Sequence, residues 1–155
     1  MHAFREEIQT YSGTATKWSQ RAVNTHTAQE QHVLFSLDIS AAFLKGLTFE
    51  EIAKETGTTL RSVQFDFPKA DAWLLRKLPG MEDFDAQAEV LDLLNAMWGL
   101  KDAPRAFTMR LARTLGSLDY VQGITDRQTW RKFSKTGDKK LCTILTTHIG
   151  DIKGA

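Results

Sequence analysis

The sequence predicts an α+β domain in which an antiparallel sheet carries helices packed on one face. The apolar run at 33–39 is typical of a strand, and apolar residues recur at helical spacing over 90–98 and 103–117. Two further runs, at 129–133 and 141–149, flank a turn-rich interval and predict a β-hairpin. A chain of 155 residues with 42% hydrophobic composition can bury a core, so one domain is the default expectation.

The bulk composition excludes few classes of function. A formal net charge of +1 gives no global basic signature, so nucleic-acid binding would depend on local clusters. The single cysteine, Cys142, excludes an internal disulfide framework. One basic cluster has the composition of a solvated face, and it consists of Arg131, Lys132, Lys135, Lys139 and Lys140.

No segment predicts export or membrane insertion. Residues 1–10 lack the apolar region of a secretory signal, and no stretch reaches the apolar length of a membrane span. We therefore expect an intracellular protein, in cytoplasm or nucleus, with no membrane partner. Residues 1–31 are polar and weakly patterned, so we expect this N-terminal segment to be weakly ordered or only partly helical.

The run at 33–39 carries an acid, Asp38, near its far end. A short, continuous apolar run bounded by polar residues is the pattern of a strand buried on both faces. Burying an unpaired carboxylate is costly, so Asp38 must lie at the strand end, meet a partner or hold a cation. The structural alternative is that Asp38 caps the turn at 41–44.

Residues 51–63 have the spacing of a helix-turn-helix, in which Gly57 would take a left-handed turn position and Val63 would pack back from a second helix. A non-enzymatic DNA-binding module at 48–64 is therefore an alternative function. Pro68 would stop the second helix early, and 63–67 alternates with the period of a strand. A helical hairpin used only for packing is the competing interpretation.

Two helices are predicted downstream. The first is a core-facing helix that ends before Gly99, and its apolar positions are Val90, Leu93, Leu94, Met97 and Trp98. The second runs from about Ala103 to Ser117, with Asp102 as N-cap and Pro104 in the first turn. Its apolar stripe consists of Phe107, Leu111, Leu115 and Leu118.

The last part of the chain predicts strands joined by turns. The hairpin of 129–133 and 141–149 turns at 135–138, and Gly150-Asp151 gives a second turn signal. Residues 152–155 then form the start of a further strand. Between the two predicted helices, Lys101 stands next to a helix N-terminus, where backbone N–H groups can meet phosphate, although an ordinary turn explains the same residues.

Three segments, at 37–44, 98–107 and 148–152, follow one another in a fixed order with wide separations. Together they resemble the palm of a copia-type retrotransposon reverse transcriptase. The resemblance covers 32–155, with an insertion at about 47–73, and implies a partial palm and fingers domain with a palm-like antiparallel sheet. It also implies that most of the fingers, the thumb and any RNase H domain are absent, so the chain resembles an incomplete, truncated copy of a Pol polyprotein.

The first segment matches the family motif at Asp38, Ala42, Phe43 and Leu44. By this resemblance Asp38 is a catalytic metal ligand, and Ile39 and Phe43 contact the incoming nucleotide. In the family the aromatic residue at the place of Phe43 lies against the sugar and favours deoxynucleotides. The structural alternative is that Phe43 is a core aromatic residue.

The second segment follows the family's aromatic-Gly-Leu-Lys-Gln-Ala-Pro-Arg run closely, with Asp102 in place of glutamine. The resemblance implies that Trp98, Gly99 and Lys101 lie beside the nucleotide and template. This segment is the most specific of the three.

The third segment departs from the family at one residue. Where the family has Tyr-Val-Asp-Asp, this chain has Gly150 before Asp151, so one of the expected metal-binding carboxylates is missing. Asp38 and Asp151 would remain to hold Mg²⁺, of which an intact site uses two ions for nucleotidyl transfer. The resemblance therefore implies an RNA-directed DNA polymerase domain with impaired activity, acting on template-primer and deoxynucleoside triphosphates. A relic with no molecular role is the third reading.

Overall fold

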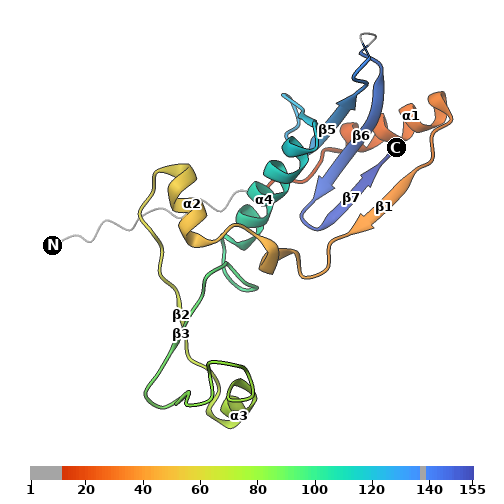
Figure 1. Cartoon of the computed structure of the whole chain (residues 1–155). Helices are drawn as coiled ribbons and strands as arrows, with labels where there is room; N and C mark the ends of the chain where they lie inside the picture. Colours follow the sequence, from red (N-terminus) through yellow and green to blue (C-terminus); the bar gives the residue numbers. More distant parts are fainter. Residues whose placement is uncertain (1–11, 137–138) are drawn as a thin grey trace. The chain divides into compact units, whose positions relative to one another are not determined.

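The structure is a computed structural model, and it describes residues 12–136 and 139–155. The chain divides into two compact units rather than one (Figure 1). The sheet unit comprises the described residues up to 47 together with 96–155, and the inserted unit comprises 48–95. The expectation about a secretory signal at 1–10 lies outside the described residues.

The sheet unit contains a five-stranded antiparallel sheet with the strand order β1-β7-β6-β5-β4. The predicted hairpin and a further strand are confirmed, because β5 pairs with β6 and β6 pairs with β7. The second turn consists of Ile149 and Gly150 rather than the predicted Gly150 and Asp151, so the last strand begins one residue earlier than predicted. The strands are β1 (Phe35–Asp38), β4 (Val121–Gln122), β5 (Thr129–Phe133), β6 (Leu141–His148) and β7 (Asp151–Gly154). The prediction of an antiparallel sheet with helices is thus confirmed.

Helix α4 (Ala103–Ser117) has the predicted bounds and covers one face of the sheet. Its stripe is buried at Phe107, Leu111 and Leu115, whereas Leu118 is 51% exposed, so the predicted stripe is one residue too long. Asp102 makes no side-chain capping bond, because its helical φ of −93° and ψ of −6° differ from the extended backbone of an N-cap. The core cluster on this face also contains Trp130, Leu145 and Ile152.

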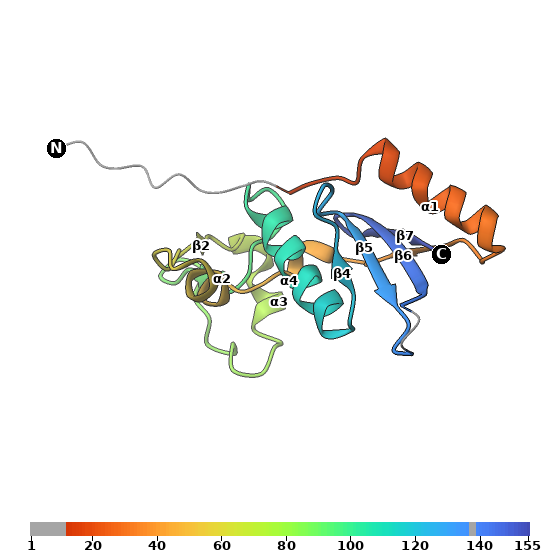
Figure 2. The same cartoon turned by 90° about the horizontal axis from the view of Figure 1, so that it is seen from above.

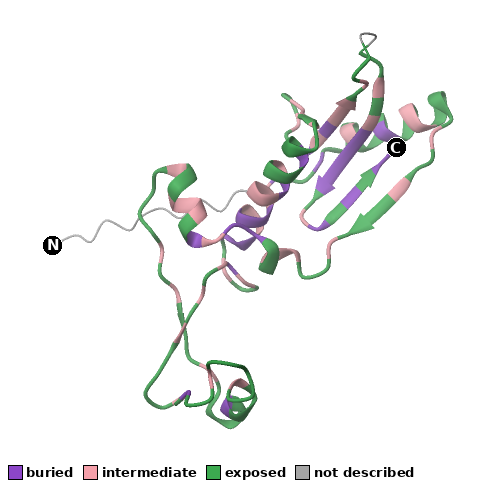
Figure 3. Cartoon of the chain, in the orientation of Figure 1, coloured by how far each residue is buried: buried purple, intermediate pink, exposed green. Residues whose placement is uncertain are grey.

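Helix α1 (Lys17–Glu30) packs on the opposite face of the sheet, so the prediction that helices cover one face is wrong. Val23 of α1 clusters with Ile144 and Ala155, while Leu145 belongs to the cluster beneath α4. Successive residues of a strand point to opposite faces, so the adjacent buried residues Ile144 and Leu145 require cover on both. Figure 2 shows α1 and α4 on opposite sides of the sheet, and Figure 3 shows the buried residues of β6 in purple.

The first strand is less buried than its apolar sequence indicates. Among the described strands, β1 lies at the edge of the sheet and has β7 as its one partner. Leu37 is 54% exposed and Val33, just before the strand, is 84% exposed, so the prediction of a strand buried on both faces is wrong. An edge strand has a neighbour on one side only, and apolar sequence alone does not distinguish it from a central strand.

The inserted unit begins with helix α2 (Phe49–Thr56), which is held by a capping box between Thr48 and Glu51. Gly57 ends the helix with a φ of 66°, as predicted for a left-handed position. No helix follows in 58–63, so the predicted second helix of a helix-turn-helix is absent from this fully described segment.

The rest of the inserted unit has short elements, namely β2 (Gln64–Phe65), η2 (Lys69–Asp71), α3 (Ala72–Leu75) and β3 (Leu91–Asp92). The predicted helix over 90–98 is wrong, because β3 pairs with β2 inside that range. Among the described helices, none has the length and apolar character needed to cross a membrane.

Candidate functional site

Asp38 and Asp151 stand directly opposite each other on neighbouring strands. β1 ends at Asp38, β7 begins at Asp151, and the two residues are partners in the antiparallel register. Directly opposed residues of an antiparallel pair project from the same face with their Cβ atoms about 4.5–5.5 Å apart. The structure therefore brings together the two residues that the sequence singled out as metal ligands.

The face on which these carboxylates lie is the one opposite α4. Ile152 and Leu145 belong to the cluster beneath α4, and side chains alternate along each strand, so Asp151 points to the other side. His148 of β6 pairs with Asp151, which extends the row by one polar side chain. Its Nδ1 lies 2.6 Å from Thr14 Oγ1. All three members of the row are exposed at one end of the sheet.

The electrostatics of this pair favour a cation. Like charges placed directly opposite each other in an antiparallel pair are destabilising, and a positive ion between them removes that repulsion. Carboxylate oxygens are the ligands that Mg²⁺ prefers. Two carboxylates fit one hydrated ion and fall short of the donors that two ions need, and the described residues contain no cluster of three metal-ligating side chains.

The turn between β6 and β7 fixes where Asp151 begins. It consists of Ile149 and Gly150, and Ile149 has a left-handed φ of 52° that a β-branched residue rarely adopts. The Gly150 carbonyl accepts a hydrogen bond of 2.9 Å from the Ile39 N–H. This bond ties the turn to the residue that follows Asp38.

Gly150 lies close enough to Asp38 for a side chain to reach it. A Cβ at Gly150 would lie 3.8 Å from Asp38 Oδ1, 3.1 Å from the Ile39 carbonyl oxygen and 3.2 Å from Ala42 Cβ. The last two contacts are tight and require shifts of a few tenths of an ångström. A carboxylate at this position would therefore join the existing acidic pair.

Phe43 and Trp98 form a second cluster of residues that the sequence singled out. Their ring centroids are 6.5 Å apart with an interplanar angle of 70°, which is an edge-to-face contact. Phe43 is partly buried against the core cluster, whereas Trp98 is 53% exposed. Phe43 thus has a packing role in addition to any contact with a ligand.

The segment after Asp38 is held against α4 by close backbone packing. Phe43 lies in the short helix η1 (Ala42–Lys45), and Gly46 follows it. A Cβ at Gly46 would lie only 3.1 Å from Ala106, and the Leu47 N–H donates to the Ala106 carbonyl at 3.1 Å. The first and second sequence segments are therefore neighbours in space.

Three remaining predicted site residues are placed differently. Ile39 packs against the core cluster, so its side chain faces away from the acidic pair. Gly99 has a left-handed φ of 91° in the loop before α4 and does not follow a helix. Lys101 is exposed in the same loop.

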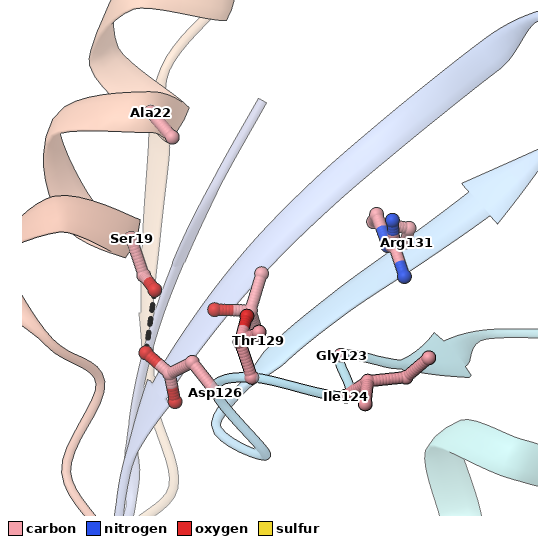
Figure 4. Close-up of a pocket in the computed structure, with 8 residues that line it drawn as sticks. Ser19, Ala22, Gly123, Ile124, Asp126, Thr129 and Arg131 are labelled. Carbon is pink, nitrogen blue, oxygen red and sulfur yellow. Dashed lines mark hydrogen bonds between the residues drawn. The ribbon is translucent and has the colours of Figure 1, made fainter.

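No sequence pattern predicted the pocket on the α1 face of the sheet, which is named the α1 pocket (Figure 4). Its residues lie in α1, in the loop after β4 and on β5, and it has a volume of about 320 Å³. Thr129 and Arg131 line it together because they are two residues apart on one strand. That spacing is a signal in the sequence, although Arg131 also belongs to the basic cluster.

Comparison with known proteins identifies no relative. No protein-family model, no curated protein and no solved structure matches this chain.

Proposed function

We propose that this chain contains a palm-like reverse-transcriptase domain of the copia type, in which Asp38 and Asp151 hold a divalent cation and Gly150 lowers the activity. The resemblance of the three sequence segments motivates the proposal. The observation that carries it is the register of β1 and β7, which places two carboxylates from distant parts of the chain opposite each other. Template-primer and deoxynucleoside triphosphates are the proposed partners.

In this proposal the chain's own residues bind the cation and orient the nucleotide. The Asp38 and Asp151 carboxylates supply oxygen ligands for Mg²⁺, which would stabilise negative charge on a phosphoryl group. Phe43 and Trp98 offer an aromatic surface near the segment that carries Asp38. Phe43 packs against the core cluster, as Ile39 does, so its proposed role beside a bound sugar rests on the family resemblance alone.

The missing carboxylate accounts for the expected weakness of the activity. Removing one electrostatic contact to the transition state costs about 10²–10³ in rate, or about 2.7–4 kcal/mol. Nucleotidyl transfer depends almost entirely on such positioning and charge stabilisation. We therefore expect wild-type protein to extend a primer slowly or not at all.

The test is primer extension by Gly150→Asp on a primed RNA template with Mg²⁺. We expect the rate to rise by roughly 10²–10³ over wild type, because the new side chain lies beside Asp38. Gly150→Ala is the matched control, since it introduces the same crowding against Ile39 without a carboxylate, and it should not raise the rate. A folded Gly150→Asp protein that extends no primer would overturn the proposal.

Cation binding gives a readout that does not depend on activity. Mn²⁺ added to wild-type protein should broaden the amide resonances next to Asp38 and Asp151, and Asp38→Asn should weaken this effect. Asp66→Asn, which removes an exposed acid of the inserted unit, should leave the broadening unchanged. Equal broadening in Asp38→Asn and in wild type would show that the acidic pair holds no ion.

The two alternative functions make different predictions. A DNA-binding helix-turn-helix lacks its recognition helix, because 58–63 is not helical, and it is not proposed. A relic without a role predicts a chain that does not fold. A cooperative thermal transition measured by circular dichroism would argue against a relic, whereas a broad, featureless melt would support it.

A further inference from the structure

Strand β1 leaves one edge of the sheet open among the described residues (Figure 1). Hydrogen-bonded and non-hydrogen-bonded pairs alternate along an antiparallel ladder, and the Ile39 N–H donates to the Gly150 carbonyl at 2.9 Å. By this alternation the backbone N–H and C=O of Leu37 face β7, whereas those of Ser36 and Asp38 face the open side. A row of outward backbone groups is a template for pairing with another strand.

β1 lacks the usual devices that protect such an edge. Natural edge strands are guarded by lysine or proline, by a bulge, or by being very short. β1 contains neither lysine nor proline, and its register with β7 runs without a bulge. The other edge strand, β4, has two residues, whereas β1 has four. β1 is therefore the edge that can accept a further strand.

The exposed apolar side chains of this edge lie on one face. Phe35 packs against the core cluster beneath α4, so Leu37, two residues on, projects from the same face. Continued upstream, the alternation places Val33 there too. Val33 is 84% exposed and Leu37 is 54% exposed, which leaves two large apolar side chains in water on either side of Phe35.

The segment is complementary to itself in one antiparallel register. A two-fold axis at Phe35 places Val33 of each copy opposite Leu37 of the other, so each exposed side chain covers the other. The same register sets Leu34 opposite Ser36, and both residues belong to the outward-facing set that can exchange hydrogen bonds. Moving the axis to Leu37 would place Val33 beyond the end of the partner strand.

The polar residues at the two ends agree with this register. Asp38 stands opposite His32 of the other copy, and an imidazole N–H can donate to a carboxylate. The ring of His32 contacts that of His26 in α1 with centroids 5.3 Å apart, so it lies toward the α1 face, as Asp38 does. No like charges are opposed. An axis at Ser36 would instead set Asp38 against the apolar Leu34.

We propose that β1 pairs with β1 of a second copy of this chain, antiparallel about a two-fold axis at Phe35. The pairing joins the two five-stranded sheets into one continuous sheet. It is an isologous contact, so it closes at the dimer. It uses the backbone of the edge and does not depend on the proposed function.

The test is sedimentation velocity of the whole chain over a range of concentrations, where we expect a monomer–dimer equilibrium. Ser36→Pro removes an outward N–H and leaves the bonds of Leu37 to β7 in place. It should weaken dimerisation by roughly tenfold or more, because two symmetry-related hydrogen bonds are lost. Ser36→Ala is the matched control, since it keeps the N–H, and it should dimerise like wild type.

Val33→Lys is a second variant that does not strain the strand, because Val33 is 84% exposed before β1. It should also yield monomer, with the circular dichroism spectrum of wild type. A monomer at every concentration up to about 1 mM in wild type would overturn the proposal and leave this edge to a strand of another protein. A dimer unchanged in both Ser36→Pro and Val33→Lys would place the interface elsewhere on the chain.

Disulfide cross-linking tests the register. In a Cys142→Ser background, which removes the exposed native thiol, a mixture of Val33→Cys and Leu37→Cys proteins should form a cross-linked heterodimer. Directly opposed residues of an antiparallel pair have the spacing that a disulfide needs. A mixture of Val33→Cys and Ser36→Cys should not cross-link, because those side chains project from opposite faces. Equal cross-linking in both mixtures would contradict the register.

Discussion

The sheet unit and the inserted unit distribute their apolar residues very differently. In the sheet unit, α1 and α4 cover opposite faces, and large side chains such as Trp130 and Leu145 are at most 4% exposed. In the inserted unit the buried hydrophobic residues are Phe49, Ala72 and Phe84. Its exposed large hydrophobic residues are Leu60, Phe65, Trp73, Leu74, Leu78, Val90 and Leu94.

This difference shows where the folding free energy of the chain resides. Burial of apolar surface contributes roughly 25 cal/mol per Å², so a unit that fully buries few large apolar residues gains little. The inserted unit depends on local features instead, such as the capping box of α2 and the aromatic contacts of Phe67 with Phe65 and Phe84. We expect it to open at a lower free energy than the sheet unit.

The largest expected effect comes from truncating one leucine in each unit. Leu145→Ala should lower the free energy of unfolding by about 2–5 kcal/mol, because Leu145 is 4% exposed in the core cluster. Leu94→Ala should change it by about 0.5 kcal/mol or less, since Leu94 is 75% exposed. Urea denaturation followed by circular dichroism measures both values. Equal losses of unfolding free energy would contradict the proposed difference in apolar burial between the units.

A smaller effect is expected from adding one methyl group at a glycine of each unit. Gly154→Ala should cost about 1–3 kcal/mol, because the new Cβ would collide with Leu145 Cδ2 and lie 2.8 Å from the Ile144 carbonyl oxygen. Gly57→Ala should cost about 1 kcal/mol through its left-handed φ of 66° alone, since nothing lies within 4 Å.

Asparagine at the same two glycines separates the causes. Gly57→Asn should recover much of the loss seen in Gly57→Ala, because asparagine tolerates the left-handed region. Gly154→Asn should be no better than Gly154→Ala. Denaturant midpoints of the four variants report the order, and recovery by asparagine at 154 would contradict tight packing there.

The smallest effect concerns an acid in each unit. Burial raises the pKa of Asp126, but hydrogen bonds from Ser19, Thr16 and Gln128 hold that pKa below its usual value. The stabilising contribution of Asp126 is therefore present above the unfolded pKa and is lost as pH falls through the folded pKa. Asp126→Asn should therefore flatten the dependence of stability on pH below about 4, with a loss near neutral pH of about 1 kcal/mol.

Glu82 of the inserted unit is the control for Asp126. Backbone hydrogen bonds at Glu82 and Gly80 lower its pKa too, but the side chain is fully exposed. Glu82→Gln should leave the pH profile of unfolding close to that of wild type. Unfolding midpoints measured between pH 2 and 7 compare the two variants. A larger change in Glu82→Gln than in Asp126→Asn would show that the acid sensitivity arises in the inserted unit and would contradict the prediction.

Local sequence signals correctly predicted the elements whose residues favour only one type of secondary structure. The bounds of α4 follow from Pro104 in the first turn and from the spacing of Phe107, Leu111 and Leu115. The hairpin of β5 and β6 follows from two apolar runs around a polar turn. In these elements the local preference and the tertiary packing agree.

The errors arose where long-range packing decides the structure. The residues from Val90 to Trp98 have helical spacing, but pairing of β3 with β2 overrides it. The run at 33–39 reads as a central strand, because the number of neighbours of β1 is not encoded in its own residues. For the same reason, only the family resemblance, and no local pattern, joined Asp38 to Asp151.

The length of the turn between β6 and β7 determines which mutations keep Asp38 and Asp151 opposite each other. Ile149 keeps a costly backbone conformation there because it is packed against the core cluster. A substitution at Gly150 alters one side chain and leaves Asp151 opposite Asp38. Inserting or deleting a single residue would turn every side chain of β7 to the other face of the sheet. The pair is therefore tolerant of point substitution and intolerant of any change in the length of this turn.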